Sequence, residues 1–212
     1  MEVIIIGNGG HSKVIQEMIS SLKFKITAIL DDKYTDYKRE KEINYAPIES
    51  VEKYLKPDVK VVIAIGDNAF RKMVSNKLEL HPDHYLTVIH PTAIISRSAV
   101  IGVGTVIMPD VVINAEATIG DHCIINTGAI IEHGNKVRNF GHVSPNATLT
   151  GCVSTGEGVH IGASATVIPG ISVGSWSVIG AGATVIENLP SFSTAVGCPA
   201  KIIKRGGDVI AQ

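Results

Sequence analysis

The stretch TVIMPDVVINAEATIGDHCIINTGAIIEHG, residues 105–134, carries an aliphatic residue at every sixth position. A six-residue period fits neither an amphipathic helix nor a strand that alternates between two faces. It is typical of a β-helix, in which each hexapeptide forms one flat face and three hexapeptides close a triangular coil. A β-sandwich is the alternative, but it needs turn signals about every 8–12 residues, and none breaks this count.

The period extends in both directions from this stretch without a slip. Of its sixteen anchor positions fifteen are aliphatic, and Thr155 is the exception. At eighteen residues per coil, the repeat predicts about five coils. Glycine recurs directly after the anchors, where a tight corner favours a residue without a Cβ atom. The anchors are Ile95, Ile101, Ile107, Ile113, Ile119, Ile125, Ile131, Val137, Val143, Leu149, Thr155, Ile161, Val167, Val173, Ile179 and Val185, and the glycines are Gly102, Gly120, Gly156, Gly162, Gly174 and Gly180.

The first ninety residues follow a different pattern. They hold 13 of the 19 Lys and Arg residues and 13 of the 20 Asp and Glu residues. Apolar runs over 2–7, 25–30 and 59–66 predict strands. Residues 11–22 predict a helix with Val14 and Ile15 on its apolar face, 47–55 a short helix, and 67–80 a helix that Asp67 caps. This alternation predicts an α/β, Rossmann-like domain over residues 1–88, a β-helix over 89–190, and a tail over 191–212 that covers the last coil.

The loop GNGGHSK, residues 7–13, follows the first predicted strand and opens the first helix. It resembles GxGxxG, but Ser12 replaces the third glycine, so it is a weak indication of NAD and a better one of a phosphate cradle at a helix N-terminus. Asp31 and Asp32 end the second strand, where a dinucleotide fold keeps its ribose-binding acid. His11 would point to the ligand, or it has no special role.

Glu132, His133 and His142 lie within eleven residues of one another in an otherwise plain stretch. Residues 18 apart stack in neighbouring coils at roughly 4.8 Å, so His142 and His160 share a column. His133 is half a coil from His142, and the two should project from different sides. A site containing both needs two protomers, which threefold packing of parallel prisms would supply. Alternatively, the histidines bond to the backbone or pack at a trimer interface. The spacing gives no close pair of metal ligands, and we expect no metal.

Several motifs are similar to those of one known group. They are GNGGHSKV at residues 7–14, LDD at 30–32, IGDN at 65–68, HP at 90–91, IIEH at 130–133, GHVSP at 141–145 and VGCPAK at 196–201. The chain resembles the PglD/NeuD group of hexapeptide-repeat sugar acetyltransferases, which includes EpsM-like enzymes from exopolysaccharide operons. The resemblance implies a left-handed parallel β-helix, a homotrimer, and transfer of acetyl from acetyl-CoA to the amino group of a nucleotide-linked sugar, typically a UDP-linked 4-amino sugar.

The resemblance also implies roles for particular residues. His133 matches the general base, and a histidine with a pKa near 6.5 suits that task. The group often has an acid directly after this histidine, where this chain has Gly134, so Glu132, Asn126 or another subunit must orient the ring. The nucleotide sugar would contact Gly9, Gly10, His11, Asp31, Asp32, Gly66 and Asn126, and acetyl-CoA would contact His142, Gly151, His160, Gly162, Gly180 and Lys201.

The resemblance leaves two other functions open, a sugar O-acetyltransferase of the sialic-acid type and a non-catalytic nucleotide-binding scaffold. The net charge of −1 gives no electrostatic reason to expect nucleic acid or an anionic membrane as a partner. The cysteines, Cys123, Cys152 and Cys198, form no metal-type pair, and each is expected to be a small buried residue in a reducing compartment. Without a signal peptide or a long apolar span, we expect a soluble cytoplasmic protein.

Overall fold

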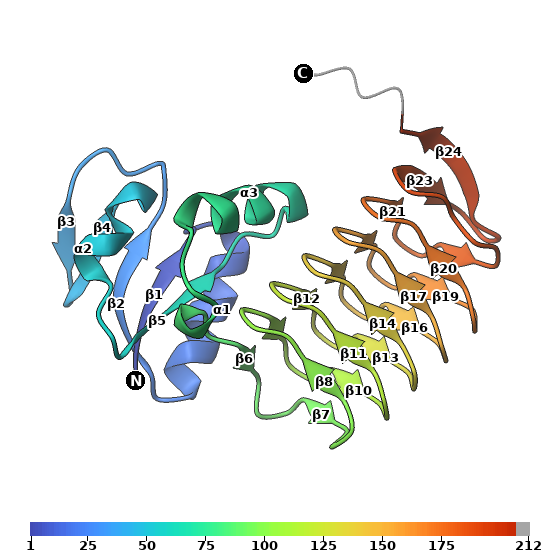
Figure 1. Ribbon diagram of the computed structural model, residues 1–212, viewed down its shortest axis with the longest axis horizontal. Helices are drawn as coiled ribbons and strands as arrows, with labels where there is room; N and C mark the ends of the chain where they lie inside the picture. Colours follow the sequence, from blue (N-terminus) through green and yellow to red (C-terminus); the bar gives the residue numbers. More distant parts are fainter. Residues whose placement is uncertain (207–212) are drawn as a thin grey trace. The chain divides into compact units, whose positions relative to one another are not determined.

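A computed structural model describes residues 1–206 of the chain. It separates into two compact units, Met1–Val88 and Ile89–Gln212 (Figure 1). The first unit contains helices and a mixed sheet, and the second contains a long series of two-residue strands. No helix among the described residues is long and apolar enough to cross a membrane.

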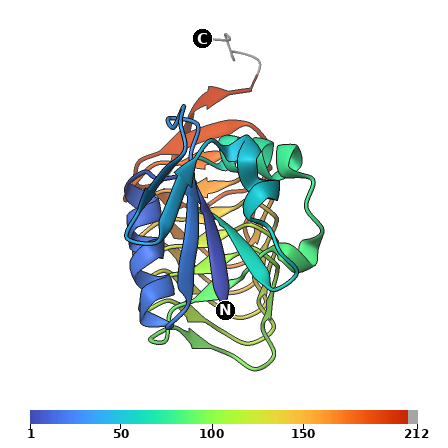
Figure 2. The same ribbon diagram turned by 90° about the vertical axis from the view of Figure 1, so that its left-hand side faces the viewer.

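The N-terminal unit has a five-stranded sheet with the order β3-β4-β2-β1-β5. All neighbours pair in parallel except the edge strand β3 with β4. Figure 2 shows α1 on one side of this sheet and α2 with α3 on the other. The elements are β1 (Glu2–Ile6), α1 (Gly10–Ser21), β2 (Lys25–Leu30), β3 (Lys38–Glu40), β4 (Ile43–Ala46), η1 (Ile48–Ser50), α2 (Val51–Tyr54), β5 (Val59–Ile63), α3 (Asn68–Leu78) and η2 (Pro82–His84).

The helices of this unit follow their local sequence signals with one exception. Asp67 caps α3 as predicted, because its side chain accepts a hydrogen bond from the Phe70 backbone N–H at 2.7 Å. Helix α1 buries Ile15, Met18 and Ile19. Val14 is 40% exposed, so its placement on the buried face was wrong, since it lies at the margin of the stripe that a 3.6-residue period defines.

The second unit is a left-handed parallel β-helix with three sheets, named here after their first strands. The β7 sheet contains β7 (Ile94–Ile95), β10 (Val112–Ile113), β13 (Ile130–Ile131), β16 (Thr148–Leu149), β19 (Thr166–Val167) and β22 (Thr184–Val185). The β8 sheet contains β8 (Val100–Ile101), β11 (Thr118–Ile119), β14 (Lys136–Val137), β17 (Ser154–Thr155) and β20 (Ser172–Val173). The β6 sheet contains β6 (Val88–Ile89), β9 (Val106–Ile107), β12 (Ile124–Ile125), β15 (His142–Val143), β18 (His160–Ile161), β21 (Val178–Ile179), β23 (Ser193–Val196) and β24 (Lys201–Arg205).

The predicted anchors form the interior of this β-helix. Strands from β7 to β22 pair in parallel with strands 18 residues away, as Ile113 pairs with Ile131 and Ile131 with Leu149. Every anchor from Ile107 to Val185 is buried, and the first two anchors are half-buried. Residues 201–205 form β24, which pairs antiparallel with β23 at one end of the β6 sheet. The tail therefore adds strands to that sheet, and residues 207–212 lie outside the described range.

Two expectations for the small residues need correction. The glycines that follow the anchors do not have positive φ; that backbone conformation falls two residues later, for example at Gly104 and His122. A Cβ atom on Gly102 would lie 2.5 Å from the Gly120 carbonyl carbon, so these glycines permit close stacking of coils. Cys123 is buried as expected, but Cys152 and Cys198 are exposed, because they lie in outward turns that the six-residue count does not describe.

Candidate functional site

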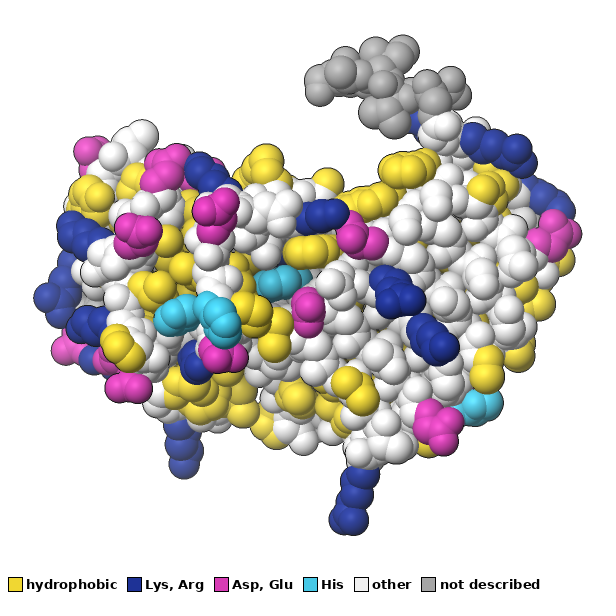
Figure 3. All heavy atoms as spheres, viewed as in Figure 1, with side chains coloured by type: hydrophobic (Ala, Val, Ile, Leu, Met, Phe, Trp, Pro, Cys, Tyr) yellow, Lys and Arg dark blue, Asp and Glu magenta, His cyan; other side chains and the backbone are white. Residues whose placement is uncertain are grey.

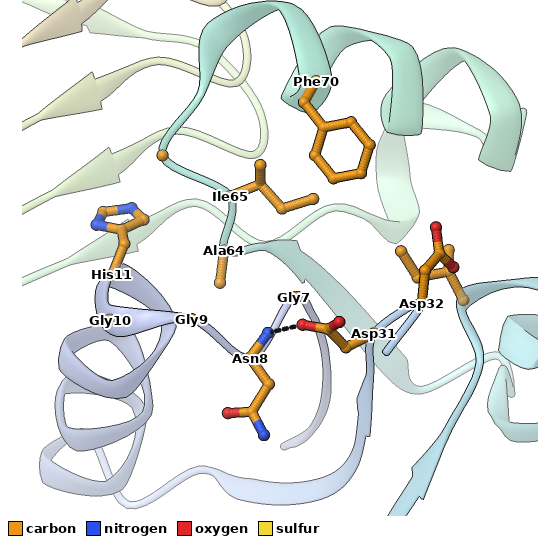
Figure 4. Close-up of a pocket in the computed structure, with 12 residues that line it drawn as sticks. Gly7, Asn8, Gly9, Gly10, His11, Asp31, Asp32, Ala64, Ile65 and Phe70 are labelled. Carbon is orange, nitrogen blue, oxygen red and sulfur yellow. Dashed lines mark hydrogen bonds between the residues drawn. The ribbon is translucent and has the colours of Figure 1, made fainter. Parts of the chain in front are cut away.

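A pocket of about 300 Å³ opens in the N-terminal unit at the carboxyl ends of β1, β2 and β5 (Figure 4). This edge of a parallel sheet is where open α/β folds bind ligands. The predicted residues Gly9, Gly10, His11, Asp31, Asp32 and Gly66 all line it, together with Gly7, Asn8, Ile48, Ala64, Ile65 and Phe70.

The glycine loop of this pocket is held in place by residues that follow β2. Asp31 accepts hydrogen bonds from the backbone N–H groups of Asn8, at 2.6 Å, and of Lys33, at 3.0 Å. The Lys33 ammonium donates to the Asn8 carbonyl at 2.6 Å, and the Asn8 amide donates to the Tyr34 hydroxyl at 2.5 Å. Asp31 therefore positions the loop, while the exposed Asp32 carboxylate is available to a ligand.

Packing does not require glycine at Gly9 or Gly10. A Cβ atom built on either would meet nothing within 4 Å. Open space above a glycine at the start of a helix lets a ligand approach the backbone N–H groups closely, as phosphates do in nucleotide-binding loops. The geometry therefore agrees with a phosphate cradle at the N-terminus of α1.

His11 is kept neutral in this pocket. Its burial, and then the positive charge of Arg71, lower the pKa of His11 to about 4. The Arg71 guanidinium is itself buried and donates to the carbonyls of Ile65 and Gly66, at 2.9 and 3.1 Å, and to the side chain of Asn68 at 2.8 Å. A neutral imidazole at pH 7 can donate one hydrogen bond and accept another.

A second group of predicted residues lies on the β6 sheet. His142 and His160 pair across adjacent strands, and their rings stack with centroids 4.7 Å apart and planes 10° apart. This confirms their expected column. The Asn126 amide nitrogen lies 3.1 Å from His142 Nε2, and the Ser144 hydroxyl lies 2.9 Å from His160 Nε2.

The Asn126 contact defines a tautomer. Asn126 Oδ1 accepts the Thr127 backbone N–H at 2.8 Å, so its amide nitrogen is the donor toward His142. In neutral His142, Nε2 is then the acceptor, and the proton resides on Nδ1. Asn126 thus contacts His142 in this protomer, which argues against its orienting His133 there.

His133 lies apart from these histidines, in the turn between β13 of the β7 sheet and β14 of the β8 sheet. It lies on a different side from His142, as the spacing of half a coil predicts. His133 is exposed, and the neighbouring Glu132 is half-buried. Within residues 1–206, no hydrogen bond involves the His133 ring. A Cβ atom on Gly151, one coil later, would lie 2.7 Å from His133 Nε2 and 2.8 Å from Cε1, so the ring lies over this glycine.

The predicted site residues thus form three groups. Several residues at or beside the N-terminal pocket were missed: Asn8 within the glycine motif, Lys33 and Tyr34 directly after the LDD motif, and Phe70 two residues after IGDN. Their positions beside strand ends could have indicated them. No cluster of metal-ligating side chains occurs among the described residues. The groups are Gly9, Gly10, His11, Asp31, Asp32 and Gly66 in the pocket; Asn126, His142, His160, Gly162, Gly180 and Lys201 on the β6 sheet; and Glu132, His133 and Gly151 at the corner.

Residues 2–78 match the family model of the PglD N-terminal domain. The chain is 49% identical over 106 residues to UDP-N-acetylbacillosamine N-acetyltransferase of Bacillus subtilis (strain 168). That alignment covers 49% of each chain, so the chain matches about half the length of this curated relative.

Solved structures match almost the whole chain. PerB from Caulobacter crescentus, in complex with CoA and GDP-perosamine, superposes with a TM-score of 0.86 at 35% identity over 96% of this chain and 98% of that one. The acetyltransferase domain of PglB from Neisseria gonorrhoeae FA1090, in complex with acetyl coenzyme A, gives 0.84 at 31% identity over 95% and 98%. The chain therefore belongs to the PglD-like family of hexapeptide-repeat sugar acetyltransferases.

Proposed function

We propose that the chain transfers acetyl from acetyl-CoA to the amino group of a UDP-linked 4-amino sugar, with His133 as general base. The observation that carries the proposal is the pairing, in one chain, of a phosphate-cradle pocket with a β-helix that presents an exposed imidazole from a corner. Relatives that match both units are described with CoA and a nucleotide-linked amino sugar. The curated relative supports UDP as the nucleotide. Synthesis of bacterial exopolysaccharide or glycan precursors is the proposed setting.

The reaction needs no enzyme nucleophile. The neutral amine attacks the thioester carbonyl, the C–N bond forms, and His133 accepts the proton that the nitrogen loses. The tetrahedral intermediate then expels the CoA thiolate, and the imidazolium returns its proton to the sulfur. Holding both co-substrates in contact supplies much of the rate enhancement.

The site is proposed to form between protomers of a homotrimer. His133 projects from the corner between two sheets, and His142 lies on the third sheet, so one protomer cannot present both to the same small molecule. Because no group of residues 1–206 bonds to the His133 ring, its orienting acceptor is proposed to be Glu132 after a side-chain rotation or a group of the neighbouring protomer.

Acetyl-CoA is proposed to lie along the β6 sheet. His142 and His160 lie on the adjacent strands β15 and β18, Gly162 and Gly180 directly follow β18 and β21, and Lys201 is exposed on the end strand β24.

Two alternatives remain distinct from this proposal. A hydroxyl acceptor needs stronger base assistance than an amine, and His133 has no adjacent acid after it, which favours N- over O-acetylation. A non-catalytic scaffold would have no use for the exposed His133 over Gly151.

The proposal is tested by incubating the purified chain with acetyl-CoA and a panel of sugars, followed by mass spectrometry of the products. The panel contains a UDP-linked 4-amino sugar, its GDP-linked equivalent, the matching 4-hydroxy sugar and a free sialic acid. We expect an acetamide product from the UDP-linked amine. Acetylation of the hydroxyl sugars alone would establish O-acetylation, and the absence of any product would support the scaffold.

A further inference from the structure

Lys136 and Arg138 are the only Lys and Arg residues between Arg97 and Lys201, a range that holds six Asp and Glu residues. They flank the buried anchor Val137, so both side chains project outward from the β8 sheet. Both are exposed, and within residues 1–206 neither forms an ion pair with an acidic side chain. On the face in Figure 3, small polar side chains and backbone cover most of the β-helix, and few cations interrupt them.

Arg138 occupies a position that is glycine in all four of the other coils of the β8 sheet. A Cβ atom on any of those glycines would come within 2.2 to 2.6 Å of a backbone atom in the following coil. Each of them donates its backbone N–H to that coil at 2.8 Å, whereas the Arg138 N–H lies 3.2 Å from the Thr155 carbonyl. Arg138 therefore loosens the stacking of its coil. The glycines are Gly102, Gly120, Gly156 and Gly174.

A side chain that breaks the local packing rule without improving the core points to a function outside the core. Lys136 and Arg138, with Thr118 one coil below, line a hollow of about 270 Å³. The guanidinium and ammonium groups offer only donors, and a guanidinium matches two phosphate oxygens at once. The negative charges elsewhere on the β-helix would repel a phosphate from most other places on it.

We propose that Thr118, Lys136 and Arg138 bind a phosphate group of a nucleotide co-substrate, an inference that rests on the proposed acetyltransferase function. Lys136 and Arg138 follow His133 by three and five residues, so their Cα atoms lie within about 11 and 18 Å of the His133 Cα. CoA carries its thiol and its phosphates at opposite ends of a flexible arm, and the nucleotide sugar carries a diphosphate. CoA and the nucleotide sugar both carry phosphate groups, which are the groups that this hollow would bind.

The test measures binding of CoA, dephospho-CoA and UDP to the full chain by calorimetry at low salt. Arg138→Gly restores the residue of the other coils, Lys136→Thr copies the coil below, and Arg97→Ser is the control for loss of an unrelated cation. We expect Arg138→Gly to weaken one ligand by about 10- to 100-fold, as loss of a charge-assisted hydrogen bond does, with an equal or higher melting temperature. Lys136→Thr should weaken the same ligand, and Arg97→Ser none.

The pattern across ligands identifies the bound phosphate. If the variants lose affinity for CoA alone, the bound group is the 3′-phosphate of CoA. If they lose affinity for both CoA and dephospho-CoA, it is the CoA diphosphate. If they lose affinity for UDP, it is the diphosphate of the nucleotide sugar. Variant affinities for all three ligands within twofold of the wild-type values would overturn the proposal. The proposal would also be overturned if the variants instead lowered the molecular mass of the protein in solution, because the two cations would then hold copies of the chain together. Acetyl transfer by the wild type at saturating substrate tests the proposed function separately.

Discussion

Replacement of Gly151 by alanine tests whether the position of His133 matters for turnover. The six turn positions of this corner column, 97, 115, 133, 151, 169 and 187, are Arg, Ala, His, Gly, Pro and Glu. The turn itself therefore accepts a Cβ atom, and Gly151 has no positive φ. The three nearest atoms to an added Cβ all belong to the His133 ring, at 2.7, 2.8 and 3.5 Å. Since ordinary carbon contacts begin near 3.5 Å, the ring must move by roughly 0.7 Å or rotate.

A displacement of about 1 Å in a reacting group costs on the order of 10²-fold in rate. We expect Gly151→Ala to lower kcat by about 10- to 100-fold with an unchanged melting temperature. Pro169→Ala, at the same corner two coils from His133, is the matched control and should retain full turnover. In His133→Ala, adding Gly151→Ala should cause no further loss. A Gly151→Ala protein with wild-type kcat would refute the role of this ring position.

Three further predictions concern stability, protonation and exposure. Thr155→Val should raise the melting temperature of the β-helix by about 2–12 °C. The buried Thr155 hydroxyl has no hydrogen-bond partner within residues 1–206, and such burial costs about 1–3 kcal/mol; an unchanged or lower melting temperature contradicts this. An NMR titration should show that His11 becomes protonated only near pH 4. Between pH 6.5 and 4 only the unfolded chain binds this proton, so the free energy of unfolding of the N-terminal unit should fall by up to roughly 3 kcal/mol as the pH is lowered through this range. Titration of His11 near pH 6.5 would exclude this. Iodoacetamide should modify Cys152 and Cys198 in the native protein but Cys123 only after unfolding, as mass spectrometry of digests would reveal.

The β-helix could be predicted because its burial is decided locally and repeatedly. Each anchor enters the interior once per hexapeptide, so the count alone gives the strand pairs and the column of His142 and His160. The exposure of Cys152 could not be read in this way, because it lies in an outward turn. The role of the glycines that follow the anchors could not be predicted either. It depends on the distance between neighbouring coils, which the sequence of one coil does not specify.

The candidate site was predictable in its residue types and less so in its contacts. The pocket residues follow strand ends, which a parallel sheet brings to one edge. The bond between Asn8 and Tyr34 joins segments 26 residues apart, and no local pattern predicts it. The partner of Asn126 could have been predicted from the count, because the anchors Ile125 and Val143 are 18 residues apart and therefore share a sheet.

The most direct test of the central claim is the steady-state kinetics of His133→Ala with acetyl-CoA and the UDP-linked 4-amino sugar. Loss of a positioned general base should lower kcat by on the order of 10²- to 10⁴-fold, while the affinity for acetyl-CoA, measured by calorimetry, stays within about threefold of the wild-type value. A variant that turns over at the wild-type rate would remove His133 from the proton transfer and contradict the mechanism.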